Sequence, residues 1–199
     1  MRKRSYERNP CKVGVEILMI YQKGNYYHVF NRGCNKEKIF FAESDYKNLL
    51  TKIKLTKDKY KIEVIAYCLL PNHYHLMLYQ ASDKPISDWL RDLFNGYVQR
   101  FNRKYDRSGT IFERTAKPKL ITSDKYLIDG IHYIHSNPFK HGMVNNPEDW
   151  KFSSLSEYLG EENVLVSKRI VGNYFYKDYT YQTSFQEYME NKKFKEELD

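Results

Sequence analysis

Short β-type segments alternate with longer segments of helical spacing along the middle of the chain. Residues 25–31 (NYYHVFN), 62–69 (IEVIAYCL) and 73–79 are rich in aromatic and β-branched residues, as strands are. Apolar residues recur at near-helical spacing in 44–55 and again in 86–105, which predicts two helices. Pro71 and Asn72 separate the second and third strands, so these two should form an antiparallel hairpin.

A further strand and helix follow. Residues 117–122 (KPKLIT) suit an edge strand, because Pro118 cannot donate a hydrogen bond in a central ladder. A helix should begin at Ser123 or Asp124 and run to about Asn137, because Pro138 disfavours the α conformation in the residue before it. The order favours an α+β fold, a ferredoxin-like split βαβ antiparallel sheet with helices packed on one face.

The chain is long enough for one sizeable core, since it has 199 residues of which 41% are hydrophobic. We expect a basic N-terminal arm or added strand in 1–24, a single main domain in 25–160 and a helical C-terminal extension in 161–199. No segment approaches the roughly 20 apolar residues that a membrane span needs.

Lysine and arginine number 33 against 25 aspartates and glutamates, a formal net charge of +8. This excess suits a polyanionic partner such as nucleic acid without establishing one. Cys11, Cys34 and Cys68 have no paired spacing, which argues against a disulfide framework. We therefore expect a soluble cytoplasmic protein.

The first candidate site is the run PNHYHLML at 71–78, which contains His73 and His75. Side chains two apart on a strand point to the same face, so the two imidazoles should stand side by side. They are either half-buried structural histidines or two ligands of a metal ion. A metal site would need a third ligand from elsewhere in the fold.

Tyr133 and Asn137 are four apart on the predicted last helix, so they share a face. Tyr133 is either a core residue or a phenolic nucleophile, and Asn137 either ends the helix before Pro138 or offers its carbonyl oxygen to a metal. Tyr126 is the rival nucleophile, because it lies two turns earlier on the same face.

Several motifs together resemble one known family. The motifs are YHVFNRG (27–33), LLPNHYHLML (69–78), YIHSNPFKHGMV (133–144) and WKFSS (150–154). In this order they resemble the IS200/IS605-type single-tyrosine transposases, most closely their REP-associated tyrosine transposase branch. The resemblance covers about residues 25–160.

This resemblance implies a bacterial HUH single-strand DNA endonuclease with an antiparallel sheet and flanking helices. Its nucleophile falls on Tyr133, and its metal ligands fall on His73, His75 and Asn137. The related two-gene insertion-sequence members commonly carry Gln at the last position, so Asn137 places the chain with the REP-associated branch. The implied ion is Mg or Mn, and the implied intermediate is a covalent 5′-phosphotyrosine on single-stranded, hairpin or palindromic REP-like DNA. Members include monomers and homodimers.

A DNA-binding surface is suggested by basic residues interleaved with aromatic ones, the mixture that single strands need. The alternative is a solvated basic helix face over a core stripe. The candidates are Arg32, Tyr97, Arg100, Arg103, Lys104, Arg107, Arg114, Lys117 and Lys119.

Two other functions remain compatible with these residues. One is a protein that binds single-stranded or hairpin nucleic acid without cutting it. The other is a metal-dependent phosphodiesterase that uses an activated water and no covalent tyrosine.

Overall fold

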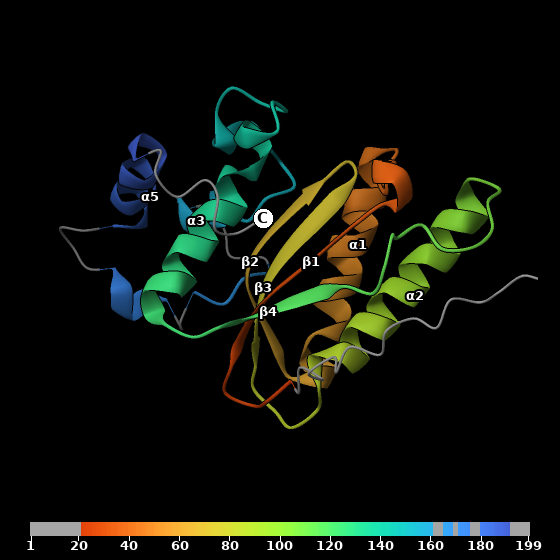
Figure 1. The fold of residues 1–199 in the computed structure, drawn as a ribbon, viewed down its shortest axis with the longest axis horizontal. Coiled ribbons are helices and arrows are strands. Elements are labelled where there is room, and N and C mark those ends of the chain that lie inside the picture. The colour runs from red at the N-terminus through yellow and green to blue at the C-terminus, as the bar shows by residue number, and fades with distance from the viewer. Residues whose placement is uncertain (1–20, 161–164, 169–170, 176–179, 192–199) are drawn as a thin grey trace, which may run out of the picture.

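The computed structural model describes residues 21–160, 165–168, 171–175 and 180–191 (Figure 1). The predicted arm at 1–24 lies almost entirely outside the described residues. Part of the predicted extension at 161–199 is described, and it contains one longer helix, α5 (Tyr181–Glu190).

The centre of the molecule is a four-stranded antiparallel sheet (Figure 1). Its strands stand in the order β2-β3-β1-β4, so β4 forms an edge, as Pro118 predicted. The hairpin turn at Pro71 and Asn72 joins β2 to β3 as expected. The bounds are β1 (Tyr26–Arg32), β2 (Ile62–Leu70), β3 (His73–Gln80) and β4 (Lys117–Ile121).

One face of the sheet is covered by α1 (Glu43–Thr56) and α2 (Ile86–Lys104) (Figure 1). Val29, Leu76 and Leu78 of the strands share a buried cluster with side chains of both helices. Successive residues of a strand point to opposite faces, so the odd members of β1 and the even members of β3 build this core.

The opposite face is covered by α3 (Asp124–Lys140) (Figure 1). Met77 and Ile65 of the sheet pack there with Leu127 and Ile131 of α3. The α+β antiparallel fold is confirmed, but the expectation of helices on one face was wrong for α3. The reason is that β2 and β3 are buried on both faces, so each face needs a cover.

The helix α3 extends one turn beyond its predicted end at Asn137, with Pro138 inside it. The last turn still closes, because the amide of His141 donates to the carbonyl of Asn137 at 3.0 Å and Met143 donates to Pro138 at 2.8 Å. Proline removes its own amide donor and its ring crowds the carbonyl four residues earlier, but the amides that follow it can still form helical bonds. Asn137 therefore has a regular helical position and does not fray at a terminus.

The WKFSS segment at 150–154 lies along the outer edge of β2. The amide of Leu69 donates to the carbonyl of Phe152, and Ser154 donates to Tyr67, each at 2.9 Å. The Trp150 indole also donates to the Leu69 carbonyl at 2.9 Å. The motif thus covers a sheet edge that would otherwise expose unpaired backbone groups. A short helix, α4 (Leu155–Tyr158), follows.

The remaining regular elements are 3-10 turns at Cys34–Lys36, Asp58–Tyr60, Pro147–Asp149 and Gly172–Tyr174. Within the described ranges, none of the helices has the length and apolarity that crossing a bilayer requires.

Candidate catalytic site

Three histidines lie on the sheet face that α3 covers. His73 and His75 belong to β3, and His28 belongs to the neighbouring strand β1. In the ladder Phe30 stands opposite His75 and Arg32 opposite His73, so the even residues of β1 share the histidine face. The sequence prediction that His73 and His75 stand side by side agrees with their ring centroids, which are 5.2 Å apart.

His75 is buried and held by a second histidine. Its Nδ1 lies 2.9 Å from Nε2 of His28, and the two rings are stacked with centroids 5.1 Å apart. Burial, reinforced by the nearby imidazoles of His28 and His73, lowers the pKa of His75 well below its ordinary value. The ring is therefore neutral at physiological pH, which is the form that binds metals.

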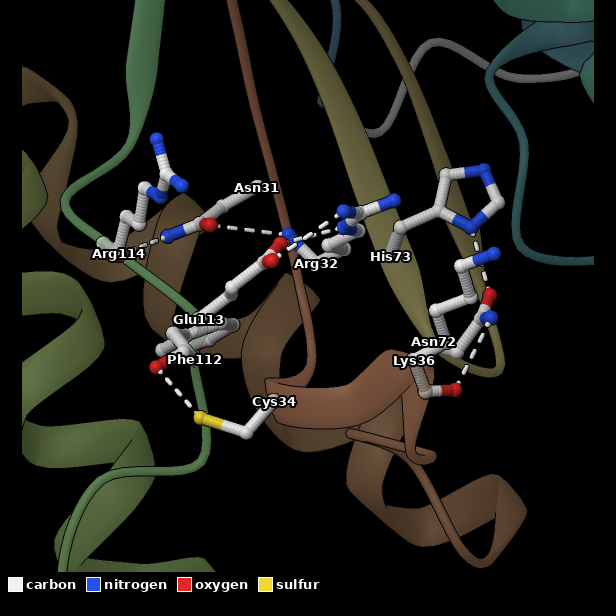
Figure 2. A network of polar contacts seen from close by, with 9 residues as sticks. All are labelled: Asn31, Arg32, Cys34, Lys36, Asn72, His73, Phe112, Glu113 and Arg114. Carbon is white, nitrogen blue, oxygen red and sulfur yellow. Dashed lines mark hydrogen bonds and ion pairs between the residues drawn. The ribbon is translucent and has the colours of Figure 1, made fainter.

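His73 is half-buried at the start of β3 and is held by the residue before it. Its Nδ1 lies 2.7 Å from Oδ1 of Asn72, and the Asn72 amide nitrogen donates to the carbonyl of Lys36 at 3.2 Å (Figure 2). The ring of the exposed His141, which caps α3, lies edge-on to His73 with centroids 4.7 Å apart. His73 thus stands at the open margin of the site.

Tyr133 lies directly against the buried histidines. Its ring centroid is 5.5 Å from that of His75 and 6.1 Å from that of His28. Gly130, one turn earlier, allows this close approach, since a Cβ there would lie 2.7 Å from Cε of Met77 on the sheet. Tyr133 is only 2% exposed, and the ammonium of Lys140 lies 4.1 Å from its ring centroid. Lys140 thus places a positive charge against the aromatic ring of Tyr133.

Asn137 is completely buried one turn after Tyr133. Its amide nitrogen donates to the Tyr133 carbonyl at 2.9 Å, whereas its Oδ1 has no hydrogen-bond partner among the described residues. A buried amide oxygen without a partner is costly, and ligation of a cation would satisfy it. Two imidazoles and this oxygen are donors of the kinds that divalent ions bind in proteins.

Across the described ranges, no group of three or more His, Cys, Asp and Glu side chains is placed to hold a metal. The predicted set instead combines two imidazoles with an amide. Imidazole and carbonyl ligands together accept Mg, Mn or Zn, so the donor atoms alone do not select one ion.

The rival nucleophile Tyr126 lies in the first turn of α3, where its backbone amide donates to the cap residue Ser123. Tyr133 is the tyrosine whose ring meets the face of His28 and His75. Tyr133 thus contacts His75, Asn137 follows it by one helical turn, and His73 lies against His141 at the end of the same helix.

Part of the predicted DNA-binding set lies on the histidine face or beside it. Arg32 is exposed and forms an ion pair with Glu113, and Asn31 donates to the Arg114 carbonyl at 2.7 Å (Figure 2). The ammonium of Lys119 lies 5.8 Å from the ring centroid of Phe30. Lys117 is the first residue of β4.

The other part lies on or after α2, which packs against the opposite face of the sheet. Arg100 and Arg103 are exposed there, and Lys104 forms an ion pair with Asp45 at 2.6 Å. Tyr97 is only 2% exposed and donates its hydroxyl to the Ile39 carbonyl at 2.5 Å, so a base cannot stack on it. For Tyr97 the alternative of a core residue holds, and its predicted stacking with a base was wrong.

Arg107 pairs with a residue near the turn that holds Asn72. Its guanidinium lies 3.7 Å from the carboxylate of Glu37, directly after the Lys36 carbonyl that accepts from Asn72.

Sequence reasoning missed His28, Asn72 and Lys140. His28 lies inside the YHVFNRG motif, but its closeness to His75 depends on which strands are neighbours. Asn72 was interpreted only as a turn residue. Lys140 lies beyond the predicted end of α3, and only the continued helix places it two turns after Tyr133, on the same face.

Two other histidines of α3 belong to a different contact. His135 is hydrogen-bonded to the Tyr181 hydroxyl at 2.5 Å and to Ser154 Oγ at 2.7 Å. His132 is hydrogen-bonded to Ser184 Oγ at 3.2 Å. These bonds connect α3 to α5 and to the segment before α4.

Comparison with known proteins relates these features to one family. A family described as IS200-like transposases matches residues 21–137. A Haemophilus influenzae protein named as a REP-associated tyrosine transposase is 34% identical over 117 residues, which cover 51% of this chain and 64% of that protein. The chain therefore matches less than two thirds of the relative's length.

A solved structure of a REP-associated tyrosine transposase bound to a REP hairpin has the same fold. It aligns with a TM-score of 0.57 and 21% identity over 80% of this chain and 87% of that one. Since the family match extends from the first strand to Asn137 and includes both histidines and Tyr133, the chain belongs to the IS200-like transposase family.

Proposed function

We propose that this protein is a metal-dependent enzyme that nicks and rejoins single-stranded DNA through a covalent bond to Tyr133. The observation that carries the proposal is the packing of the Tyr133 ring against His75, with ring centroids 5.5 Å apart. Asn137, whose amide oxygen has no hydrogen-bond partner among the described residues, follows Tyr133 by one helical turn. Membership in the transposase family supports the same chemistry.

In the proposed reaction the phenolic oxygen of Tyr133 attacks the phosphorus of a phosphodiester. The phenol gives up its proton as its oxygen bonds to phosphorus. The bond from phosphorus to the 3′ oxygen breaks, and that oxygen takes up a proton, so the number of protons is unchanged. The products are a 5′-phosphotyrosine and a free 3′-hydroxyl. The phosphotyrosine retains the phosphodiester energy, so another 3′-hydroxyl can reverse the step and join two strands without ATP.

A free phenol has a pKa near 10 and is a weak nucleophile at neutral pH. Lys140 lies over the Tyr133 ring, so we assign to it the positive charge that faces the reacting groups. Tyr133 is only 2% exposed. The bound strand therefore has to displace the side chains that cover the Tyr133 ring, and the Lys140 ammonium can then contact a phosphate.

His73, His75 and Asn137 are the residues that would hold a divalent ion, Mg or Mn by family resemblance. When bound, such an ion supplies charge neutralisation at a phosphate oxygen. The residues themselves arrange the site: β3 fixes both imidazoles, and the helical position of Asn137 fixes the amide beside the nucleophile.

The substrate that we propose is single-stranded or hairpin DNA, in line with the REP hairpin bound by the structural neighbour. The surface that would receive it surrounds His73 at the end of β1 and before β4. Arg32, Arg114 and Lys119 supply positive charge there.

The test is to incubate the protein with hairpin DNA labelled at its 3′ end and Mn²⁺ and to separate the products on a denaturing gel. A labelled protein–DNA adduct is expected, and Tyr133→Phe should abolish it. Tyr126→Phe is the matched control, because it removes the same hydroxyl from the first turn of the same helix and should keep the adduct.

Each alternative gives a different result. Cleavage without an adduct would indicate hydrolysis by an activated water, and binding without cleavage would indicate a recognition protein. An adduct that persists in Tyr133→Phe would refute the assignment of the nucleophile.

A further inference from the structure

We propose that His28 and Asn72 are positioning residues that hold the two imidazoles of the HxH pair with Nε2 directed toward the ion. The inference rests on the proposed function, because it concerns how the same metal site is prepared. Neither residue was predicted from the sequence to take part in the site.

The two contacts have the same form. Nδ1 of His75 is engaged by Nε2 of His28 at 2.9 Å, and Nδ1 of His73 is engaged by Oδ1 of Asn72 at 2.7 Å. A neutral imidazole carries its proton on one nitrogen and a lone pair on the other. When Nδ1 holds the proton and donates it, Nε2 carries the lone pair that a metal needs.

Asn72 fixes this choice for His73. Its own amide nitrogen donates to the Lys36 carbonyl at 3.2 Å, so its oxygen is the atom directed at His73 (Figure 2). An oxygen can only accept, and therefore Nδ1 of His73 carries the proton. The Lys36 carbonyl belongs to the turn directly after β1, so the backbone of one segment sets the orientation of a side chain in another.

We assign the corresponding role for His75 to His28, with Nε2 of His28 as the acceptor of their 2.9 Å contact. It is completely buried and belongs to the strand next to β3, so its ring cannot swing away without disturbing the sheet. Its ring also lies edge-on to Tyr133, with centroids 6.1 Å apart. One side chain thus contacts both the expected ligand and the expected nucleophile. Groups that orient metal-binding histidines commonly change metal affinity by about 10- to 100-fold when removed.

Two pairs of variants separate orientation from bulk. His28→Gln keeps an acceptor oxygen at about the position of Nε2, whereas His28→Met has nearly the same shape without it. Asn72→Asp keeps the acceptor for His73, whereas Asn72→Leu removes it at similar volume. The control is His132→Gln, which removes a buried histidine whose hydrogen bond runs to Ser184 on α5.

The first readout is Mn²⁺ affinity without DNA, measured from the free-ion signal in electron paramagnetic resonance. We expect the Met and Leu variants to lose about tenfold or more in affinity, and the Gln, Asp and control variants to stay within about threefold of wild type. Equal affinity in the Met and Gln variants would overturn the role of His28. Equal affinity in the Leu and Asp variants would overturn that of Asn72.

The second readout needs no substitution at His28 and therefore does not depend on how its variants fold. Long-range ¹H–¹⁵N spectra of the metal-free wild-type protein report which nitrogen of each histidine carries the proton. With His75 and His73 assigned from their own Gln variants, both should be protonated on Nδ1. Protonation on Nε2 in either ring would refute the inference for that ring.

These outcomes are independent of the proposed reaction. Failure of strand cleavage with normal, orientation-dependent Mn²⁺ binding would refute the proposed function and leave the positioning role in place. Cleavage with unchanged metal affinity in all four variants would do the reverse.

Discussion

Acidification should weaken the contact between α3 and α5 through His132. This ring is buried against α5, where its Nε2 is hydrogen-bonded to Ser184 Oγ and its ring lies 5.2 Å from those of Tyr181 and Tyr188, measured between centroids. Burial lowers the pKa of His132 from 6.5 to about 4. His132 therefore binds a proton less readily in the folded protein than in the unfolded chain.

The direction and size of the change in unfolding free energy with pH follow from this difference between the folded and unfolded pKa values. Between the folded and unfolded values of the pKa the unfolded state binds more protons, so stability is full above about pH 6.5 and is lost as the pH falls toward about 4. The complete loss corresponds to about 3 kcal/mol. Between about pH 7.5 and about pH 5.5 a single such group loses about 1.3 kcal/mol.

Urea denaturation followed by tyrosine and tryptophan fluorescence measures this loss at both pH values. The comparison is with His132→Gln, whose amide can accept from Ser184 but does not titrate. Wild type should lose about 1.3 kcal/mol more than the variant on acidification. His135, whose pKa is also lowered well below its ordinary value by burial, is present in both proteins and cancels.

The reasoning would be refuted if both proteins lost the same free energy between the two pH values. Such a result would mean that His132 either stays exposed to water or meets compensating negative charge when protonated. The carboxylates of Asp124, Asp129 and Glu187 are the candidates to supply it, since all three line the same cavity as His132.

Two further predictions concern the site and its surface. Lys140→Met should slow single-turnover adduct formation about tenfold, because the site loses the cation that lies over the Tyr133 ring, whereas Lys140→Arg should retain most of the rate. An unchanged rate in Lys140→Met would exclude this role. Removing the charges of Arg32 and Lys119 should reduce the slope of log affinity for single-stranded DNA against log salt by about 1.4. The same change at Arg100 and Arg103, across the sheet, should leave the slope unaltered, and an equal reduction there would argue against the proposed surface.

The order of the elements could be predicted from the sequence because it depends on local properties. Alternation in 62–69 and 73–79 and the Pro71-Asn72 turn were enough for the hairpin, and Pro118 was enough for an edge strand. The face on which α3 packs was not predictable in this way. Both faces of β2 and β3 are apolar, so the pattern allows a helix on either side, and long-range packing decides.

In the candidate site, too, some features follow from local periodicity and others depend on long-range packing. The faces shared by His73 and His75, and by Tyr133 and Asn137, follow from the periods of a strand and a helix. The contact of His28 with His75 depends on β1 lying beside β3, which is a property of the sheet order. Tyr97 was misjudged for a related reason, because an aromatic residue on an amphipathic helix has the same spacing whether it contacts DNA or the core.

The helix α3 continues through Pro138, although a proline disfavours the α conformation in the residue before it. This continuation determines the positions of Asn137 and Lys140. If α3 had ended at Asn137, the amide would have been at a fraying terminus and free to turn toward solvent. Instead the chain closes a further turn, through the bonds from His141 to Asn137 and from Met143 to Pro138. That turn buries Asn137 and brings Lys140 over Tyr133. The cost of one missing amide donor is thus offset by the extra turn, and the same turn places the cation beside the proposed nucleophile.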